Sequence, residues 1–131
     1  MKLLAAVLLS CAGCATTADP RLVAQARDRL REAMQTPVAT RDQRDAQSRL
    51  LLSEVEEAQL ERLTLSELEA ALGHGNSCRV SELCRAEGFG PDDWYYPIGQ
   101  LADDKIKQLP TLIIGFDPHG HVKRVFTLRT H

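Results

Sequence analysis

The sequence predicts an α+β fold in which two or three N-terminal helices pack on a three-stranded antiparallel sheet. Three observations lead to this prediction. The first half of the chain repeats apolar residues every three or four positions, which is the period of an amphipathic helix. After Gly73 this pattern gives way to glycines, prolines and alternating apolar residues. Near the C-terminus, two apolar segments flank Asp117-Pro118-His119-Gly120, a sequence typical of a hairpin turn.

The chain begins with a segment that has the features of an export signal. Lys2 precedes an apolar run from Leu3 to Ala15 that ends in small residues. A helix needs about 20 residues to cross a bilayer, so this run is too short to be a transmembrane span. A positive start, a short apolar region and a small-residue cleavage zone together indicate a secretory signal peptide.

Two cysteines refine this prediction. Leu8-Leu9-Ser10-Cys11 and Cys11-Ala12-Gly13-Cys14 each resemble the bacterial lipobox. We favour Cys14 because Ala-Gly-Cys is the more typical core, and Cys11 is the alternative. The resemblance implies that residues 1–13 are a lipoprotein signal peptide and that the cysteine becomes an acylated N-terminus, carrying fatty acids such as palmitate. A plain signal peptide or a buried cysteine pair is the other interpretation.

Lipidation would determine where the protein resides. Two or more acyl chains anchor a protein stably, whereas one chain holds it only marginally. Alanine, rather than the aspartate that retains many lipoproteins at the inner membrane, follows Cys14. By analogy with known sorting rules, we predict a location in the cell envelope, anchored by lipid to the outer membrane and facing the periplasm.

Residues 14–63 are predicted to form a helical region. Asp19-Pro20 provides an N-cap acceptor followed by proline in the first turn. Pro37 interrupts the pattern, and Thr40 to Gln43 can form a capping box for a second helix. The charge-rich sequence that follows predicts a long, largely exposed helix that ends near Leu63.

Residues 64–131 are predicted to contain a short helix and the sheet. Thr64 and Glu67 can form a capping box, and Gly73 is placed to end the helix. In the aromatic strand Trp94-Tyr95-Tyr96, alternation places the first and third rings under the helices and leaves Tyr95 on the opposite face as a candidate partner contact. In the last strand, regular alternation predicts one shared face, formed by Val122, Phe126 and Leu128.

The order of these features resembles a known family. The short helix Thr64 to Gly73, the Trp94-Tyr95-Tyr96 strand and the hairpin from Leu112 to Val122 follow one another as in the SmpA/OmlA domain of the small outer-membrane lipoproteins called BamE. The resemblance covers Leu60 to Thr130. It implies a non-catalytic scaffold or accessory role in outer-membrane protein assembly or envelope integrity, with a protein partner. The β-lactamase inhibitor proteins share this order, so a periplasmic module that binds or inhibits an envelope enzyme is the alternative.

Cys78 and Cys84 form a second cysteine pair. In an oxidising periplasm, two cysteines in one loop with no other cysteine nearby indicate a disulfide. A regular helix would hold the two residues too far apart, so the segment between them must bend if they pair. Two free thiols are the alternative interpretation.

The sequence predicts neither catalysis nor a cofactor. It shows no glycine-rich phosphate loop and no nucleophile elbow, and Asp92-Asp93 and Asp103-Asp104 are interpreted as solvated charge. His119 and His121 lie beside Asp117 in a predicted turn, which we interpret as solvated rather than as a metal site. The net charge of −2 does not indicate nucleic acid as a partner, and no small-molecule substrate is evident. An envelope hydrolase with an unrecognised site is the alternative from another functional class.

Overall fold

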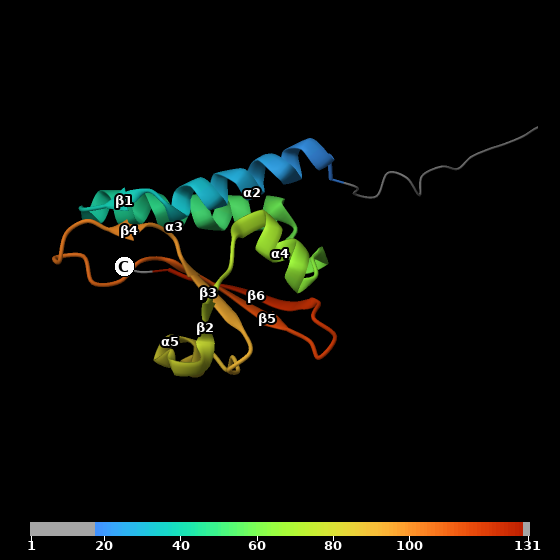
Figure 1. Cartoon of the computed structure of the whole chain (residues 1–131). Coiled ribbons are helices and arrows are strands. Elements are labelled where there is room, and N and C mark those ends of the chain that lie inside the picture. Colours follow the sequence, from blue (N-terminus) through green and yellow to red (C-terminus); the bar gives the residue numbers. More distant parts are fainter. Residues whose placement is uncertain (1–17, 130–131) are drawn as a thin grey trace, which may run out of the picture.

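The computed structural model describes residues 18–129. In this part of the chain, three helices cover one face of an antiparallel sheet and a short helix lies on the other side (Figure 1). The first three are α2 (Pro20–Met34), α3 (Arg41–Ala58) and α4 (Leu65–Leu72), and the short one is α5 (Glu82–Ala86). The predicted α+β class is confirmed. The predicted signal peptide, with Cys11 and Cys14, lies outside the described residues.

Each of the three long helices begins at the capping residue that the sequence indicates. The Asp19 side chain accepts a hydrogen bond from the backbone of Arg21 at the start of α2. Thr40 forms a capping box at the start of α3, and Thr64 forms one at the start of α4. These side chains satisfy backbone N–H groups that have no partner within the helix, which fixes where each helix starts.

The second helix is shorter than predicted. It ends at Ala58, because Gln59 adopts a left-handed conformation with φ of 49°. A single 3-10 turn, η1 (Leu60–Arg62), follows and buries Leu60 completely. The helix is also less exposed than predicted, since it packs along α2 and buries polar residues as well as Leu51.

One of these buried polar residues connects three elements. The Nε2 atom of Gln47 donates hydrogen bonds to the backbone oxygens of Ala33 and Ile98, at 2.8 and 3.2 Å. A buried amide without such partners would destabilise the fold, so these bonds make the burial of Gln47 tolerable. They tie α3 to the end of α2 and to the segment that follows the aromatic strand.

The main sheet has four antiparallel strands in the order β2-β3-β5-β6. The three predicted strands are present as β3 (Trp94–Pro97), β5 (Thr111–Phe116) and β6 (Val122–Leu128), and β2 (Asn76–Ser77) adds a short edge. β3 ends at its proline, Pro97. A separate parallel pair joins β1 (Pro37–Val38) to β4 (Gln100–Leu101).

The last hairpin has the predicted turn but a different strand pattern. Its register shifts between Gly115 and Phe116, because β6 carries an extra residue after Val122. Such a β-bulge reverses the alternation of the residues beyond it. Val122 therefore packs against the helices, whereas Phe126 packs on the opposite side with α5. The predicted shared face of these two residues is wrong for this reason.

Among the described residues, two clusters of buried residues lie on the main sheet, one on each face, and a third, formed by Val38, Ile106 and Leu109, is separate from them. The larger cluster lies between the sheet and α2, α3 and α4, and includes Leu30, Leu68 and Ile114. The smaller cluster consists of Cys78, Cys84, Phe89 and Ile113. We call these two sides the helix-side face and the disulfide-side face.

Candidate partner-binding site

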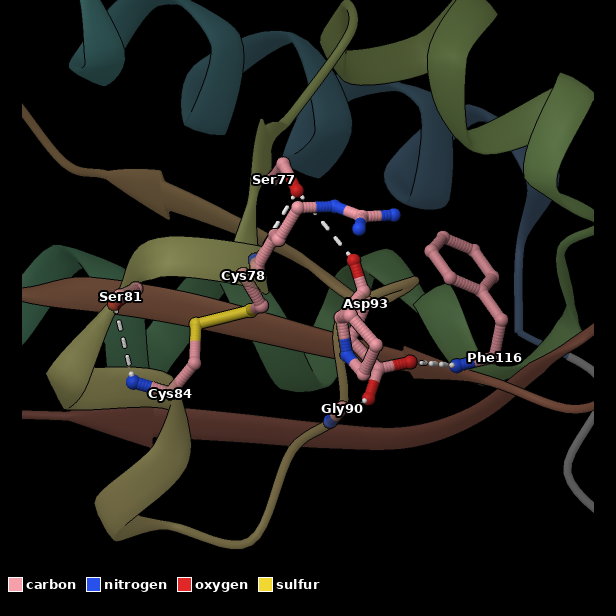
Figure 2. Close-up of a disulfide and its surroundings, with 9 residues drawn as sticks. Ser77, Cys78, Ser81, Cys84, Gly90, Asp93 and Phe116 are labelled. Carbon is pink, nitrogen blue, oxygen red and sulfur yellow. Dashed lines mark hydrogen bonds between the residues drawn. A yellow bond between two sulfur atoms is a disulfide. The ribbon is translucent and has the colours of Figure 1, made fainter.

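A disulfide shapes the segment that covers part of the disulfide-side face. Cys78 and Cys84 are joined, with their Cα atoms 5.6 Å apart, so the predicted disulfide is present (Figure 2). The 3-10 turn η2 (Cys78–Val80) and helix α5 meet at Ser81, which is extended. This is the bend that the cysteine spacing requires, because one continuous helix could not bring the two thiols together.

Serine side chains fix both turns of this loop. Ser77 accepts a hydrogen bond from the backbone of Arg79 at the start of η2, and Ser81 accepts one from Cys84 at the start of α5. Figure 2 shows the second of these bonds next to the disulfide. We call the segment from Cys78 to Cys84 the disulfide loop. Its conformation is determined by two caps and one covalent bond.

Asp93 attaches the disulfide loop to the sheet. One carboxylate oxygen accepts a hydrogen bond from Gly90 at 2.7 Å, and the other accepts one from Phe116 at 3.0 Å (Figure 2). Its backbone oxygen also accepts a hydrogen bond from Cys78. The interpretation of Asp93 as solvated charge is therefore wrong. Its neighbour Asp92 is exposed, in agreement with that interpretation.

Aromatic rings and an arginine occupy the disulfide-side face next to the loop. The guanidinium of Arg124 lies 4.2 Å from the ring centroid of Phe89, a distance typical of a cation–π contact. The rings of Phe89 and Phe126 are 6.2 Å apart. Phe89 can lie this close to the sheet because Gly115 has no side chain; a Cβ atom there would be 3.2 Å from the Phe89 ring.

Tyr95 lies where the sequence predicts, on the face away from the three long helices. It is half-buried, because it packs against the cluster that contains the disulfide. Val80 is the more accessible apolar side chain. It is 84% exposed and lies inside the disulfide loop, between the two cysteines. The site thus combines a partly open aromatic face with an exposed apolar side chain on a fixed loop.

The other two rings of the aromatic strand point toward the helices, as predicted. Trp94 and Tyr96 both belong to the helix-side cluster. The Tyr96 hydroxyl donates a hydrogen bond to the backbone oxygen of Gly73 at 2.9 Å. Burial raises the pKa of this phenol above its ordinary range, so the hydroxyl stays protonated and continues to donate.

The histidines near the hairpin turn lie as the sequence suggests, around Asp117. Its Oδ1 atom accepts hydrogen bonds from the backbone N–H groups of His119 and His121, at 2.8 and 2.9 Å. These bonds lower the pKa of the Asp117 carboxyl. The carboxylate therefore serves the turn itself. Within residues 18–129, no group of three or more possible metal-binding side chains gathers at one point.

Sequence reasoning missed four residues of the site: Phe89, Arg124, Asp93 and Val80, whose exposure within the disulfide loop no sequence pattern indicated. Phe89 lies between two glycines, which gave no periodic signal, and Arg124 reaches the site only because of the bulge in β6. Asp93 closes a turn after Gly90 and Pro91, and an aspartate in a Gly-Pro turn is the signal that could have identified it.

Comparison with protein-family models, with curated proteins and with solved structures found no match. The resemblance to the BamE family therefore stays a prediction. In the part of the chain from residue 18 to residue 129, no helix is both long and apolar enough to span a membrane.

Proposed function

We propose that this protein is a non-catalytic lipoprotein of the bacterial outer membrane that binds a protein partner in the periplasm. A BamE-like accessory role in outer-membrane protein assembly or envelope integrity is the form that the sequence resemblance favours. One observation carries the proposal of a binding role: Val80 is 84% exposed within a loop that a disulfide holds in place. An apolar side chain held rigidly in water loses little conformational entropy when a partner covers it.

The surroundings of Val80 support the same role. Tyr95, Phe126 and Arg124 lie on the same side of the sheet as the disulfide loop. Aromatic residues and arginine are enriched among the residues that contribute most to protein–protein binding. The disulfide also suits an oxidising compartment such as the periplasm.

Photocrosslinking in intact cells tests the binding role. A photoreactive amino acid would replace Val80, and in a matched control it would replace Leu101, an exposed apolar residue on β4. We expect a crosslinked product at Val80 and none at Leu101. We also expect the product to decrease when Cys78 and Cys84 are both changed to serine. A similar yield at both positions would contradict the proposal.

The identity of the crosslinked protein separates the two forms of the proposal. Recovery of components of the outer-membrane assembly machinery supports the accessory role. Recovery of a single envelope enzyme supports the inhibitory module instead.

The lipid anchor is tested separately. Cells that express Cys14→Ala or Cys11→Ala variants would be grown with a labelled fatty acid. We expect Cys14→Ala to remove the label from the protein and Cys11→Ala to leave it. Labelling that survives both substitutions would contradict lipidation in this segment.

A further inference from the structure

In the part of the chain that the structure describes, the outer edge of β6 is open along most of its length. β6 pairs with β5 on one side and is the last strand of the sheet. On its other side only the beginning is covered: the Val122 amide donates to Leu63, and the Leu65 amide donates to Gly120. Within residues 18–129, no backbone group pairs with this edge from 123 to 128. Such an edge is a template for another strand.

The pairing of β5 shows which backbone groups face each neighbour. Just beyond β3, the Ile98 amide donates a hydrogen bond to the backbone oxygen of Pro110 at 2.8 Å. In an antiparallel sheet, alternate residues direct their N–H and C=O groups to opposite sides of a strand. The even-numbered residues of β5 therefore bond to β3, and the odd-numbered ones bond to β6.

The same alternation identifies the free groups of β6. Phe126 lies opposite Ile113, an odd-numbered residue of β5, so its backbone groups are used within the sheet. The backbone groups of Val125 and Thr127 then point away from β5, to the open edge. An added strand would find two N–H donors and two carbonyl acceptors there, spaced as in a regular ladder.

The side chains along this edge determine what kind of strand would fit. Lys123, Arg124 and Arg129 are exposed, and no carboxylate of residues 18–129 lies within 4 Å of their charged groups. Val125 and Phe126 between them are half-buried. Charge complementarity favours an acidic partner strand with apolar residues between its charges. A second copy fits less well, because pairing two such edges brings like charges together.

We propose that the outer edge of β6 accepts an extended acidic segment of a partner protein, with alternating apolar residues, as a fifth strand of the sheet. Main-chain hydrogen bonds to Val125 and Thr127 would provide affinity, and the three basic side chains would select the acidic segment. This site requires neither the lipid anchor nor the disulfide loop, so it goes beyond the function proposed above.

The test uses the purified full-length chain and a fluorescent synthetic peptide of alternating glutamate and valine. Fluorescence anisotropy measures binding, and a lysine–valine peptide serves as the control. We expect the glutamate peptide to bind at least about tenfold more tightly than the lysine peptide. Hydrogen exchange should be fast at the Val125 and Thr127 amides in the free protein and slow after the glutamate peptide binds.

Two variants test the position of the site. Thr127→Pro removes an N–H donor from the open edge without removing a bond to β5, and we expect binding at least about tenfold weaker. Lys123→Glu combined with Arg129→Glu should weaken binding as strongly. Both residues are exposed, so this double variant should fold and provides the test of the site in case Thr127→Pro does not fold. The matched control is Arg79→Glu with Arg85→Glu, which changes the net charge equally at two exposed positions, one within the disulfide loop and one directly after it.

Three results would overturn the proposal. The first is equal weakening by the two pairs of charge reversals, which indicates attraction by net charge alone. The second is slow exchange at Val125 and Thr127 in the free protein at low concentration, or no protection of these amides by the peptide. The third is self-association that protects the same amides without the peptide, which would make the occupant a second copy. None of these results depends on Val80 or on lipidation, so they leave the proposed function to its own test.

Discussion

Within residues 18–129, the cluster on the helix-side face of the sheet contains fifteen buried core residues, whereas the cluster on the disulfide-side face contains four. Three long helices cover the first face, and among residues 18–129 only the disulfide loop and the residues up to Asp93 cover the second (Figure 1). Both faces contain residues that are completely buried, such as Ile114 on the helix side and Ile113 on the disulfide side. The two faces therefore differ in how many other buried side chains pack around a fully buried residue.

This difference shows two ways of stabilising a small protein. Burial of apolar surface is sufficient on the helix-side face, because many side chains share one cluster. On the disulfide-side face, a covalent bond and the hydrogen bonds of Asp93 hold a short segment that buries little by itself. The second arrangement leaves Tyr95 partly uncovered, which suits a surface that binds a partner.

The largest expected effects come from a matched pair of core substitutions on β5. We expect Ile114→Ala to lower the free energy of unfolding by about 4 kcal/mol and Ile113→Ala to lower it by about 2 kcal/mol. Both side chains are fully buried, but the packed helices would hold a cavity open at Ile114, whereas the short segment above Ile113 can move inward. Urea unfolding of both variants measures the difference. Equal costs, or a larger cost at Ile113, would contradict the proposed contrast between the faces.

Removal of the disulfide should weaken one face only. We expect Cys78→Ser with Cys84→Ser to lower the free energy of unfolding by about 2 kcal/mol, the loop-closure value for so short a loop. Hydrogen exchange should increase for residues 84–89 and remain slow in β5, because the helix-side cluster persists.

The control for this prediction is a reducing agent, which should reproduce the effect in the wild-type protein and have none on the double variant. Faster exchange throughout β5 would show that the two faces unfold together and would contradict the prediction.

The hydrogen bonds of Asp93 should contribute a smaller amount. We expect Asp93→Asn to lower the free energy of unfolding by about 1–2 kcal/mol, because the amide keeps one acceptor oxygen but turns its NH₂ group toward a backbone N–H donor. Asp92→Asn is the matched control, since it makes the same change at the exposed neighbouring carboxylate. Its effect should stay within about 0.5 kcal/mol of zero. Similar losses for both variants would show that charge, rather than the bonds of Asp93, is responsible.

The parts of this fold that the sequence predicts depend on local signals. Asp19, Thr40 and Thr64 mark the helix starts because a capping side chain bonds within three residues of its own position. The hairpin turn is predictable for the same reason, since Asp117 bonds to the backbone of the turn itself. The disulfide is predictable because Cys78 and Cys84 lie close together in the sequence and because the expected compartment, the periplasm, is oxidising.

The features that the sequence does not predict depend on distant partners. Gln59 ends α3 without a glycine or proline, and the turn after it brings Leu63 into contact with the start of β6. No feature of the β6 sequence indicates the bulge. The bulge nevertheless places the side chains of Phe126 and Arg124 on the face that contains the candidate site. Local propensity cannot determine such positions, because tertiary packing overrides it.

The smallest expected effect is a pH dependence at the start of α4, on the helix-side face. Glu67 accepts a hydrogen bond from the Thr64 amide at 3.0 Å, which lowers the pKa of its carboxyl below the ordinary value of a glutamate. A carboxyl whose pKa is lower in the folded state stabilises that state above its unfolded pKa, and the contribution is lost as the pH falls through the folded value. In Glu67→Gln the bond can persist, but this titration is removed.

The melting temperature of the wild-type protein, relative to that of Glu67→Gln, should therefore decrease as the pH is lowered from about 6 to about 3. Thermal unfolding followed by circular dichroism measures both proteins across this range. Glu61→Gln is the matched control, because Glu61 is exposed and its side chain forms no hydrogen bond with residues 18–129. A pH dependence in Glu61→Gln that parallels Glu67→Gln would assign the effect to general surface charge. A difference specific to Glu67 would show that the capping box stabilises the helix-side face through its ionised carboxylate.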